Sequence, residues 1–317
     1  MKARTPYSRR AVGAVIHDGY FWIYGGFGVT GTVNPWDIGA DLWRFGGDCW
    51  EMMNPEGPYP ARYPSLCPGD GGFFMFGGCG YDGSGLTFMN ELWFYDGRWH
   101  EVKPREGSKI PRGRYTAALA MKGDSLFVFG GHSQSRSGDK TYFGDLWMFD
   151  LHSSTWQMVH GDQGGPGARY GFGWTMDSDG LFIFGGYDGI QDLGDLWRFD
   201  LNGLRWERLA ESGPPCRYCP ALGIVSNGIV LFGGRSKVNP RQNFSDTWAF
   251  NGDWRLFDQE EGLSPGYHAK SGYASDGNGM WIFGGEGPQG HLSDLWLYRD
   301  GHWNEVHGRR KDDPSLW

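Results

Sequence analysis

Residues 129–150 read FGGHSQSRSGDKTYFGDLWMFD: an apolar run ending in a diglycine, a polar stretch, and a second run that begins Asp-Leu-Trp. The same arrangement recurs along the chain. Aligned on the diglycine, six copies begin at Gly25, Gly77, Gly130, Gly185, Gly233 and Gly284. Their spacings are 52, 53, 55, 48 and 51 residues, so the chain is an array of similar units.

Two tryptophan positions accompany every diglycine. The first is the last residue of a triplet in which an acidic residue comes first, leucine or threonine second and tryptophan third. These tryptophans are Trp43, Trp93, Trp147, Trp197, Trp248 and Trp296. The second lies several residues further on, and its members are Trp50, Trp99, Trp156, Trp206, Trp254 and Trp303. Because these positions take twelve of the 17 tryptophans, most of the tryptophan content is architectural.

Each unit contains four runs of strand length, rich in aromatic and β-branched residues and separated by Gly, Asp, Ser and Asn. In the fourth copy they are RYGFGWTM, LFIFGG, DLWRFD and WERL. A period near fifty with four strands per unit is typical of propeller blades. We therefore predict an all-β fold, a single six-bladed β-propeller with four antiparallel strands per blade. The expected blades are residues 9–54, 61–103, 113–159, 168–209, 216–257 and 267–306, with a C-terminal tail at 307–317.

This repeat resembles that of the kelch β-propellers, in which a diglycine ends the second strand and aromatic positions follow at set distances. The resemblance covers residues 9–306. It implies that the first strand of each blade lines the central channel. Since the four strands of every blade are consecutive in the sequence, we expect the ring to close by packing of blade six on blade one.

Composition narrows the class further. The formal net charge is −8 and Lys and Arg are dispersed, which argues against a nucleic-acid partner. No run has the length of a transmembrane helix and the N-terminus lacks the apolar core of a signal peptide, so we expect a cytoplasmic protein with no membrane partner. The five cysteines are odd in number and scattered, as expected of reduced thiols. The sequence leaves the oligomeric state open.

The geometry of a four-stranded meander indicates which face carries function. If the strands are labelled a to d, the b–c and d–a connections leave on one face and the a–b and c–d turns on the other. The b–c loops contain 14, 12, 13, 8, 11 and 8 residues, whereas the turns opposite are mostly short. Because loops on a rigid scaffold tolerate variation, we expect a central funnel on the b–c face to hold the binding site.

Two regular rows are expected at the mouth of this funnel. Counting back 15 or 16 residues from each diglycine gives Arg10, Arg62, Arg114, Arg169, Arg217 and His268. These arginines either pair with groups of adjacent blades or form an anion site. The next position holds Tyr63, Tyr115, Tyr170 and Tyr218 in the middle four blades. These tyrosines either pack between blades or stack on a ligand.

The position after the diglycine differs in every blade and reads Phe27, Cys79, His132, Tyr187, Arg235 and Glu286. No rule of the repeat requires six different side chains at one place. Cys79, His132, Tyr187 and Arg235 are therefore predicted to bind the ligand. Trp36, in the longest b–c loop, either anchors an interface or folds back over its own blade.

Blade six departs most from the pattern, with His268 in the arginine row and Glu286 after the diglycine. A histidine beside a carboxylate suits general acid–base catalysis, and the structural alternative is a salt-bridged histidine that compensates for the missing arginine. Cys216 and Cys219 lack a second ligand pair, so we read them as structural and expect no metal and no cofactor.

These observations favour a protein that recognises a small anionic or aromatic molecule, or a peptide, in the central funnel. The alternative is a free-standing, metal-independent isomerase, cyclase or lyase that uses the same funnel, with His268 and Glu286 as catalytic residues. A protein–protein interaction scaffold is the third reading. The fold alone does not choose among them.

Overall fold

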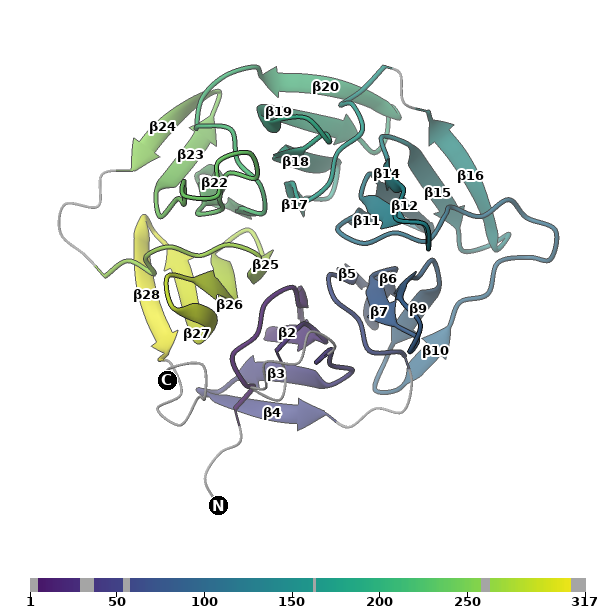
Figure 1. The fold of residues 1–317 in the computed structure, drawn as a ribbon, viewed down its shortest axis with the longest axis horizontal. Coiled ribbons are helices and arrows are strands. Elements are labelled where there is room, and N and C mark those ends of the chain that lie inside the picture. The colour runs from purple at the N-terminus through teal and green to yellow at the C-terminus, as the bar shows by residue number, and fades with distance from the viewer. Residues whose placement is uncertain (1–4, 29–36, 54–57, 162–163, 258–262, 309–317) are drawn as a thin grey trace.

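The computed structural model describes residues 5–28, 37–53, 58–161, 164–257 and 263–308. Within these residues the chain forms strands β1 to β28 and no helix, so the described part contains no helix that could cross a membrane. Six four-stranded antiparallel sheets stand around a common centre (Figure 1). The predicted six-bladed β-propeller is confirmed.

The first three blades occupy the N-terminal half of the chain. Blade one contains β1 (Gly13–His17), β2 (Tyr20–Tyr24), β3 (Leu42–Gly46) and β4 (Cys49–Met53). Blade two contains β5 (Ser65–Gly69), β6 (Gly72–Phe76), β9 (Leu92–Tyr95) and β10 (Trp99–Glu101). Blade three contains β11 (Ala118–Lys122), β12 (Ser125–Phe129), β15 (Leu146–Asp150) and β16 (Thr155–His160).

The remaining three blades follow in order. Blade four contains β17 (Gly173–Met176), β18 (Gly180–Tyr187), β19 (Asp192–Asp200) and β20 (Arg205–Ala210). Blade five contains β21 (Ala221–Val225), β22 (Gly228–Phe232), β23 (Thr247–Asn251) and β24 (Asp253–Phe257). Blade six contains β25 (Gly272–Ser275), β26 (Met280–Gly287), β27 (Gly290–Arg299) and β28 (His302–His307).

Several b–c loops are themselves strand pairs. In blade two, β7 (Cys79–Tyr81) pairs with β8 (Leu86–Phe88), and in blade three β13 (His132–Gln134) pairs with β14 (Lys140–Tyr142). In blades four and six the b and c strands continue past the diglycine as one hairpin. In blades two, three, four and six the face expected to carry function therefore contains hairpins, which hold the residue after the diglycine in a fixed register.

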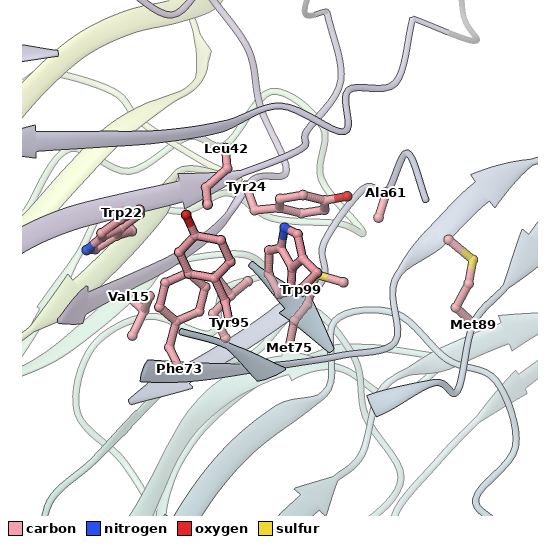
Figure 2. Packing of buried hydrophobic residues seen from close by; sticks show 11 residues of the cluster. Val15, Trp22, Tyr24, Leu42, Ala61, Phe73, Met75, Met89, Tyr95 and Trp99 are labelled. Atoms are coloured by element: carbon pink, nitrogen blue, oxygen red, sulfur yellow. The ribbon is translucent and has the colours of Figure 1, made fainter. Parts of the chain in front are cut away.

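The apolar runs of strand b form the centre of each blade interface. The aromatic residue directly before each diglycine contacts the second repeated tryptophan of the following blade. The ring centroids of Tyr24 and Trp99 lie 5.4 Å apart, and those of Phe283 and Trp50 lie 5.0 Å apart across the junction of blades six and one. Figure 2 shows Tyr24 and Trp99 within the cluster that fills the interface of blades one and two. The second repeated tryptophan of each blade therefore packs on the preceding blade.

The diglycine joins neighbouring blades through the backbone. The second glycine of each pair donates its amide hydrogen to a carbonyl at the start of strand a in the next blade, at 2.8 to 2.9 Å. The accepting residues are Arg9, Ala61, Arg114, Arg169, Arg217 and His268. Both glycines have positive φ, and a Cβ on Gly284 would lie 2.5 Å from the Arg9 oxygen. Glycine is required because the backbones approach so closely.

The ring closes without exchange of strands between the termini. Each sheet consists of strands from one continuous part of the chain, and Gly285 donates to the Arg9 carbonyl at 2.8 Å. Val12 of blade one and Leu295 of blade six share one buried cluster. The expected closure by packing of blade six on blade one is confirmed.

Candidate functional site

The inter-blade hydrogen bonds fix the register at the start of strand a. The true ring position lies 16 residues before the first glycine in every blade and holds Arg9, Ala61, Arg114, Arg169, Arg217 and His268. The sequence alignment was wrong in placing Arg10 and Arg62 in this ring, because it accepted a spacing of 15 residues in blades one and two. Both arginines lie one residue further along the chain, beside the position after the diglycine.

The ring arginines are paired within their own blades. Arg114 Nη1 and Nη2 contact the two oxygens of Asp145 at 2.6 and 3.0 Å, Nη1 also donates to the Gly130 carbonyl, and Nε donates to the Arg112 carbonyl. Trp147 donates its indole N–H to the same carboxylate at 2.6 Å. Burial raises the pKa of Asp145, but the hydrogen bonds and charge of Arg114 lower it by more, so the pKa lies below its ordinary value.

The same arrangement occurs in three other blades, as the pairs Arg9–Asp41, Arg169–Asp195 and Arg217–Asp246. Arg114 and Arg217 are almost completely buried. Since every guanidinium nitrogen of Arg114, Arg169 and Arg217 is already engaged, a ligand-binding role has no uncommitted nitrogen to rest on. Arg114, Arg169 and Arg217 therefore serve the scaffold, but their partners lie in their own blades and not in adjacent blades as the structural alternative expected. A ligand-binding role for these arginines stays a prediction.

In blades two and six other residues take the place of the arginine–aspartate pair. Ala61 takes the arginine position in blade two, and the hydroxyl of the partly buried Tyr59 donates to the Gly77 carbonyl at 3.4 Å. Burial raises the pKa of Tyr59, and the charge of Glu91, the acidic member of the blade-two triplet, raises it further. A tyrosine paired with a longer acidic residue therefore replaces the arginine–aspartate pair.

In blade six His268 replaces the arginine. Its Nε2 lies 3.3 Å from Asp294 Oδ1 and its Nδ1 lies 3.4 Å from the Gly266 carbonyl oxygen. Both imidazole nitrogens thus face groups of the scaffold, and the pairing expected with Glu286 is wrong. The structural alternative, a histidine that compensates for the missing arginine, describes this geometry. A catalytic role for His268 or Glu286 stays a prediction.

The mouth is formed by two rows that face each other across short β-bridges. The residues after the diglycines bridge to the position that follows the ring. The pairs are Arg10–Phe27, Arg62–Cys79, Tyr115–His132, Tyr170–Tyr187, Tyr218–Arg235 and Ala269–Glu286. The structure therefore brings together the post-diglycine residues and most of the tyrosines. Trp36 lies outside the described residues.

One sector of the mouth, which we call the charged sector, consists of Glu286, Arg10, Arg235 and Lys270. Glu286 Oε2 contacts Arg10 Nη1 at 2.8 Å and Lys270 Nζ at 2.5 Å, and Oε1 contacts Arg235 Nη1 at 2.9 Å. Burial raises the pKa of Glu286, but Lys270 and the two arginines outweigh it and lower the pKa. Burial lowers the pKa of Lys270, which Glu286 partly restores. Three cations share one carboxylate.

The opposite sector is aromatic. The His132 ring lies 4.9 Å from the Tyr170 ring, 5.0 Å from Tyr142 and 5.3 Å from Tyr115, measured between centroids. Tyr218 lies 5.2 Å from Tyr170 and carries Lys237 Nζ over its face at 5.6 Å. We call this group the tyrosine wall; it consists of Tyr115, Tyr142, Tyr170, Tyr187 and Tyr218, with His132 among them.

His132 is neutral in this setting. Burial lowers its pKa to about 4, and the positive charges of Lys140 and Lys237 act in the same direction. Its side chain is 5 % exposed, and no partner for Nδ1 is found among the described residues. A buried imidazole nitrogen without a partner is unusual in a folded protein. His132 therefore packs within the tyrosine wall at the mouth, while its Nδ1 makes no hydrogen bond to the described residues.

Cys79 and Arg62 lie between the two sectors. Cys79 is completely buried, and its Sγ lies 3.5 Å from Arg62 Nη2. Burial raises the pKa of the thiol, which Arg62 partly offsets. The Arg62 and Arg10 guanidinium groups lie 5.9 and 5.0 Å from the centre of the Phe27 ring. The aromatic residue of blade one thus stands between two cations at the rim.

A narrow neck lies directly below the mouth. The residue after each bridged position lies just before the innermost strand and has positive φ, at Ala11, Tyr63, Thr116, Gly171, Cys219 and Lys270. Ala11 donates its amide hydrogen to the Lys270 carbonyl at 2.8 Å, and Tyr63 donates to the Ala11 carbonyl at 2.6 Å. The Tyr63 hydroxyl lies 4.0 Å from the Cys219 sulfur, which joins blade two to blade five. Tyr63 therefore belongs to the neck and crosses the channel.

A cavity of about 350 Å³ lies beyond the neck, between the innermost strands. Tyr63, Cys219 and Lys270 bound it on one side, and it reaches Asp177 and Ser178 in the a–b turn of blade four. None of the residues after the diglycines lines this cavity. The expected funnel on the b–c face is thus not continuous with it, because Tyr63 stands between them.

Several residues of the mouth were missed by the sequence analysis. Lys270 lies two residues past the ring, beyond the two rows that were compared. Tyr142 and Phe88 come from the far strands of the b–c ribbons, where only the first residue of each loop was considered. Tyr267, whose pKa burial raises to about 12, neighbours Arg235. Among the described residues no three His, Cys, Asp or Glu side chains gather as a metal site would require.

The architecture defines a class of protein, the six-bladed propeller whose blades are joined by diglycines and repeated tryptophans. The KLHDC2/KLHL20/DRC7 Kelch-repeats domain matches residues 96–251, which include blade three, blade four and most of blade five. With the repeats of the other blades, this match shows that the chain belongs to the kelch-repeat family.

Proteins with different names and lengths are similar to this chain. The leucine-zipper-like transcriptional regulator 1 of Mus musculus is 27% identical over 262 residues, which is 76% of this chain and 29% of the relative. The kelch domain-containing protein 10 of Xenopus laevis is 26% identical over 249 residues, 75% of this chain and 58% of the relative. The Drosophila melanogaster homologue of the first is 28% identical over 199 residues, 58% of this chain and 19% of the relative. The match thus spans less than two thirds of each relative.

Proposed function

We propose that this propeller recognises an anionic ligand, a peptide or a small molecule, at the mouth formed by the charged sector and the tyrosine wall. The observation that carries the proposal is the sharing of one carboxylate, Glu286, by Arg10, Arg235 and Lys270. Three cations and one carboxylate leave a net charge of +2 at this point of a chain whose net charge is −8. An anion is attracted to such a sector, and the guanidinium groups suit carboxylates.

The accessibility of these side chains supports a binding role. Arg10, Arg235 and Glu286 are 20 to 30 % exposed, whereas the scaffold arginines Arg114 and Arg217 are completely buried. The two arginines of the charged sector each meet Glu286 through Nη1 alone. A ligand carboxylate can thus approach the remaining nitrogens of Arg10 or displace Glu286 from Arg235.

The tyrosine wall supplies a surface for the second half of the ligand. Tyr142 and Tyr187 are partly exposed and stand beside the buried Tyr170. Tyrosine rings offer a large rigid surface for an aromatic or apolar group and lose little conformational entropy on binding. We therefore expect the ligand to combine an anionic group with an adjacent ring or apolar side chain.

The proposal is tested with 4-fluorobenzoate as probe, followed by ¹⁹F NMR line broadening, and with the uncharged 4-fluorobenzyl alcohol as comparison. We expect the wild type to broaden the benzoate signal more than the alcohol signal, and the variants R10A and R235A to lose the difference. The control variant is R205A, which removes one positive charge from the outer strand β20. Equal broadening by wild type, R10A and R235A would overturn the proposal.

A further inference from the structure

The cavity beyond the neck is lined partly by aromatic rings and partly by aliphatic residues of the inner strands. Trp174 of β17 and Tyr273 of β25 lie on its wall, together with Phe172. Another part of the wall is formed by β1, which packs beside β25, and by β5, with Ala14 and Leu66. A volume of about 350 Å³ lies within the range of small-molecule sites.

The polar side chains of the aromatic half are already paired. The Tyr273 hydroxyl accepts the Trp174 amide hydrogen at 2.9 Å, and Ser275 Oγ accepts the Ile224 amide hydrogen at 2.9 Å. Two side chains of blade six thus accept hydrogen bonds from backbone N–H groups on the inner edges of blades four and five. This half presents aromatic faces rather than hydrogen-bonding groups.

The other half presents backbone. β1 and β5 are the innermost strands of their sheets and pair with a neighbour on one side only. An edge strand directs alternate N–H and C=O groups away from its partner, here toward the channel. Ala14 is small, so these groups stay within reach of a molecule in the cavity. Such an edge can hydrogen-bond the ring N–H or carbonyl of a flat ligand, as it can a water.

The fully charged groups on the lining are engaged elsewhere. Lys270 points its ammonium group to Glu286 in the charged sector, and Asp177 accepts the amide hydrogens of Asp179 and Gly180 in its own turn. A charged ligand would therefore lose its hydration without gaining a counter-ion. The lining favours an uncharged molecule.

We infer that the cavity is a second ligand site, separate from the mouth, for an uncharged planar heteroaromatic molecule. Its ring lies against Trp174 and Tyr273, and its hydrogen-bonding groups meet the inner edges of β1 and β5. The neck, which Tyr63 crosses to Cys219, separates the two sites. This inference does not depend on the proposed function of the mouth.

The test uses 6-fluoroindole as an uncharged planar probe and 4-fluorobenzoate as the probe of the mouth, both followed by ¹⁹F NMR. The variants A274F in β25 and A14F in β1 place a ring in the cavity from two different strands, so that one informative variant remains if the other does not fold. Thermal unfolding identifies the folded variants.

We expect the wild type to broaden the 6-fluoroindole signal and a folded cavity variant to reduce that broadening at least fivefold, with 4-fluorobenzoate unaffected. R235A, at the mouth, should leave 6-fluoroindole binding unchanged. Absence of 6-fluoroindole binding to the wild type, or equal binding by wild type and a folded cavity variant, overturns the inference. Loss of benzoate binding alone contradicts only the proposed function.

Discussion

The amide nitrogen of Gly285 lies 2.8 Å from the carbonyl oxygen of Arg9 and joins the last blade of the propeller to the first. The other five junctions carry the same hydrogen bond, from the second glycine of one blade to the ring residue of the next. The closing junction is therefore held by the same backbone hydrogen bond as the other five junctions. It is the repeat interface formed between the two ends of the chain.

We predict that G284A opens this junction, because its Cβ would lie 2.5 Å from the Arg9 oxygen and 2.8 Å from the Leu292 oxygen. The matched control is G47A, since Gly47 has φ of +56° against +57° for Gly284 and has open space where its Cβ would lie. The control should cost about 1 kcal/mol, the strain of a left-handed residue. G284A should cost at least about 3 kcal/mol, as steric overlap adds to that strain. Urea unfolding measures both, and equal losses would show that the close approach is unimportant.

The arginine–aspartate pair within a blade gives a second prediction. R114A leaves the Asp145 carboxylate without its counter-ion in a largely buried place, and we expect the free energy of unfolding to fall by about 3 to 5 kcal/mol. R205A, on the exposed strand β20, should change it by less than about 0.5 kcal/mol.

The double variant R114M/D145L distinguishes the effect of the paired charges from the effect of the volume that the two side chains fill. Removing both charges avoids the unpaired carboxylate, so this variant should recover more than half of the loss of R114A. A double variant as unstable as R114A would mean that the guanidinium acts through its bonds to the Gly130 and Arg112 carbonyls.

The fold was predictable because the diglycine and the second repeated tryptophan make the same contacts at every junction. Gly26 and Gly285 occupy equivalent places and make the same contact, so the sequence repeats them. The position of Arg10 was not predictable in the same way. Two adjacent arginines, Arg9 and Arg10, both fit a spacing rule that allowed one residue of tolerance, and only the hydrogen bond to Gly285 separates them.

The site was predictable only in part, because its residues come from positions that the repeat does not constrain. His132 and Glu286 stood out, since their equivalents differ in every blade. Lys270 and Tyr142 did not, because no aligned row contained them. The change of Arg to His at position 268 signalled a special blade, yet the histidine serves the same joint as the arginine. A departure from a repeat can thus mark a different solution to one structural need.

The buried His132 makes stability depend on pH. Its pKa in the fold is about 4, below the ordinary value of 6.5, so the unfolded chain binds the proton more tightly. The stabilisation is complete above pH 6.5 and is lost as the pH falls toward 4, and the loss amounts to about 3 kcal/mol. In H132F this contribution is absent, so the difference between wild type and variant should change by that amount between pH 7 and pH 4. Urea unfolding measures it, and the exposed His302, as H302Q, is the control. A constant difference across this pH range would contradict a neutral His132.

The last prediction concerns Glu286, which competes with a ligand for the charged sector. E286Q keeps the shape of the side chain but removes the negative charge that Arg10, Arg235 and Lys270 now share. Their attraction for an incoming anion rises, and we expect the affinity for 4-fluorobenzoate to increase about tenfold, which corresponds to about 1.4 kcal/mol.

Stability should move in the opposite direction. Since the pKa of Glu286 is lowered in the fold, its carboxylate stabilises the wild type above the ordinary pKa of a glutamate, and this contribution is lost as the pH falls through the lowered value. E286Q should therefore be less stable than the wild type at pH 7, and the difference should shrink on acidification. If E286Q binds 4-fluorobenzoate more weakly than the wild type, Glu286 contacts the ligand or positions the cations for it, and the competition described here is wrong.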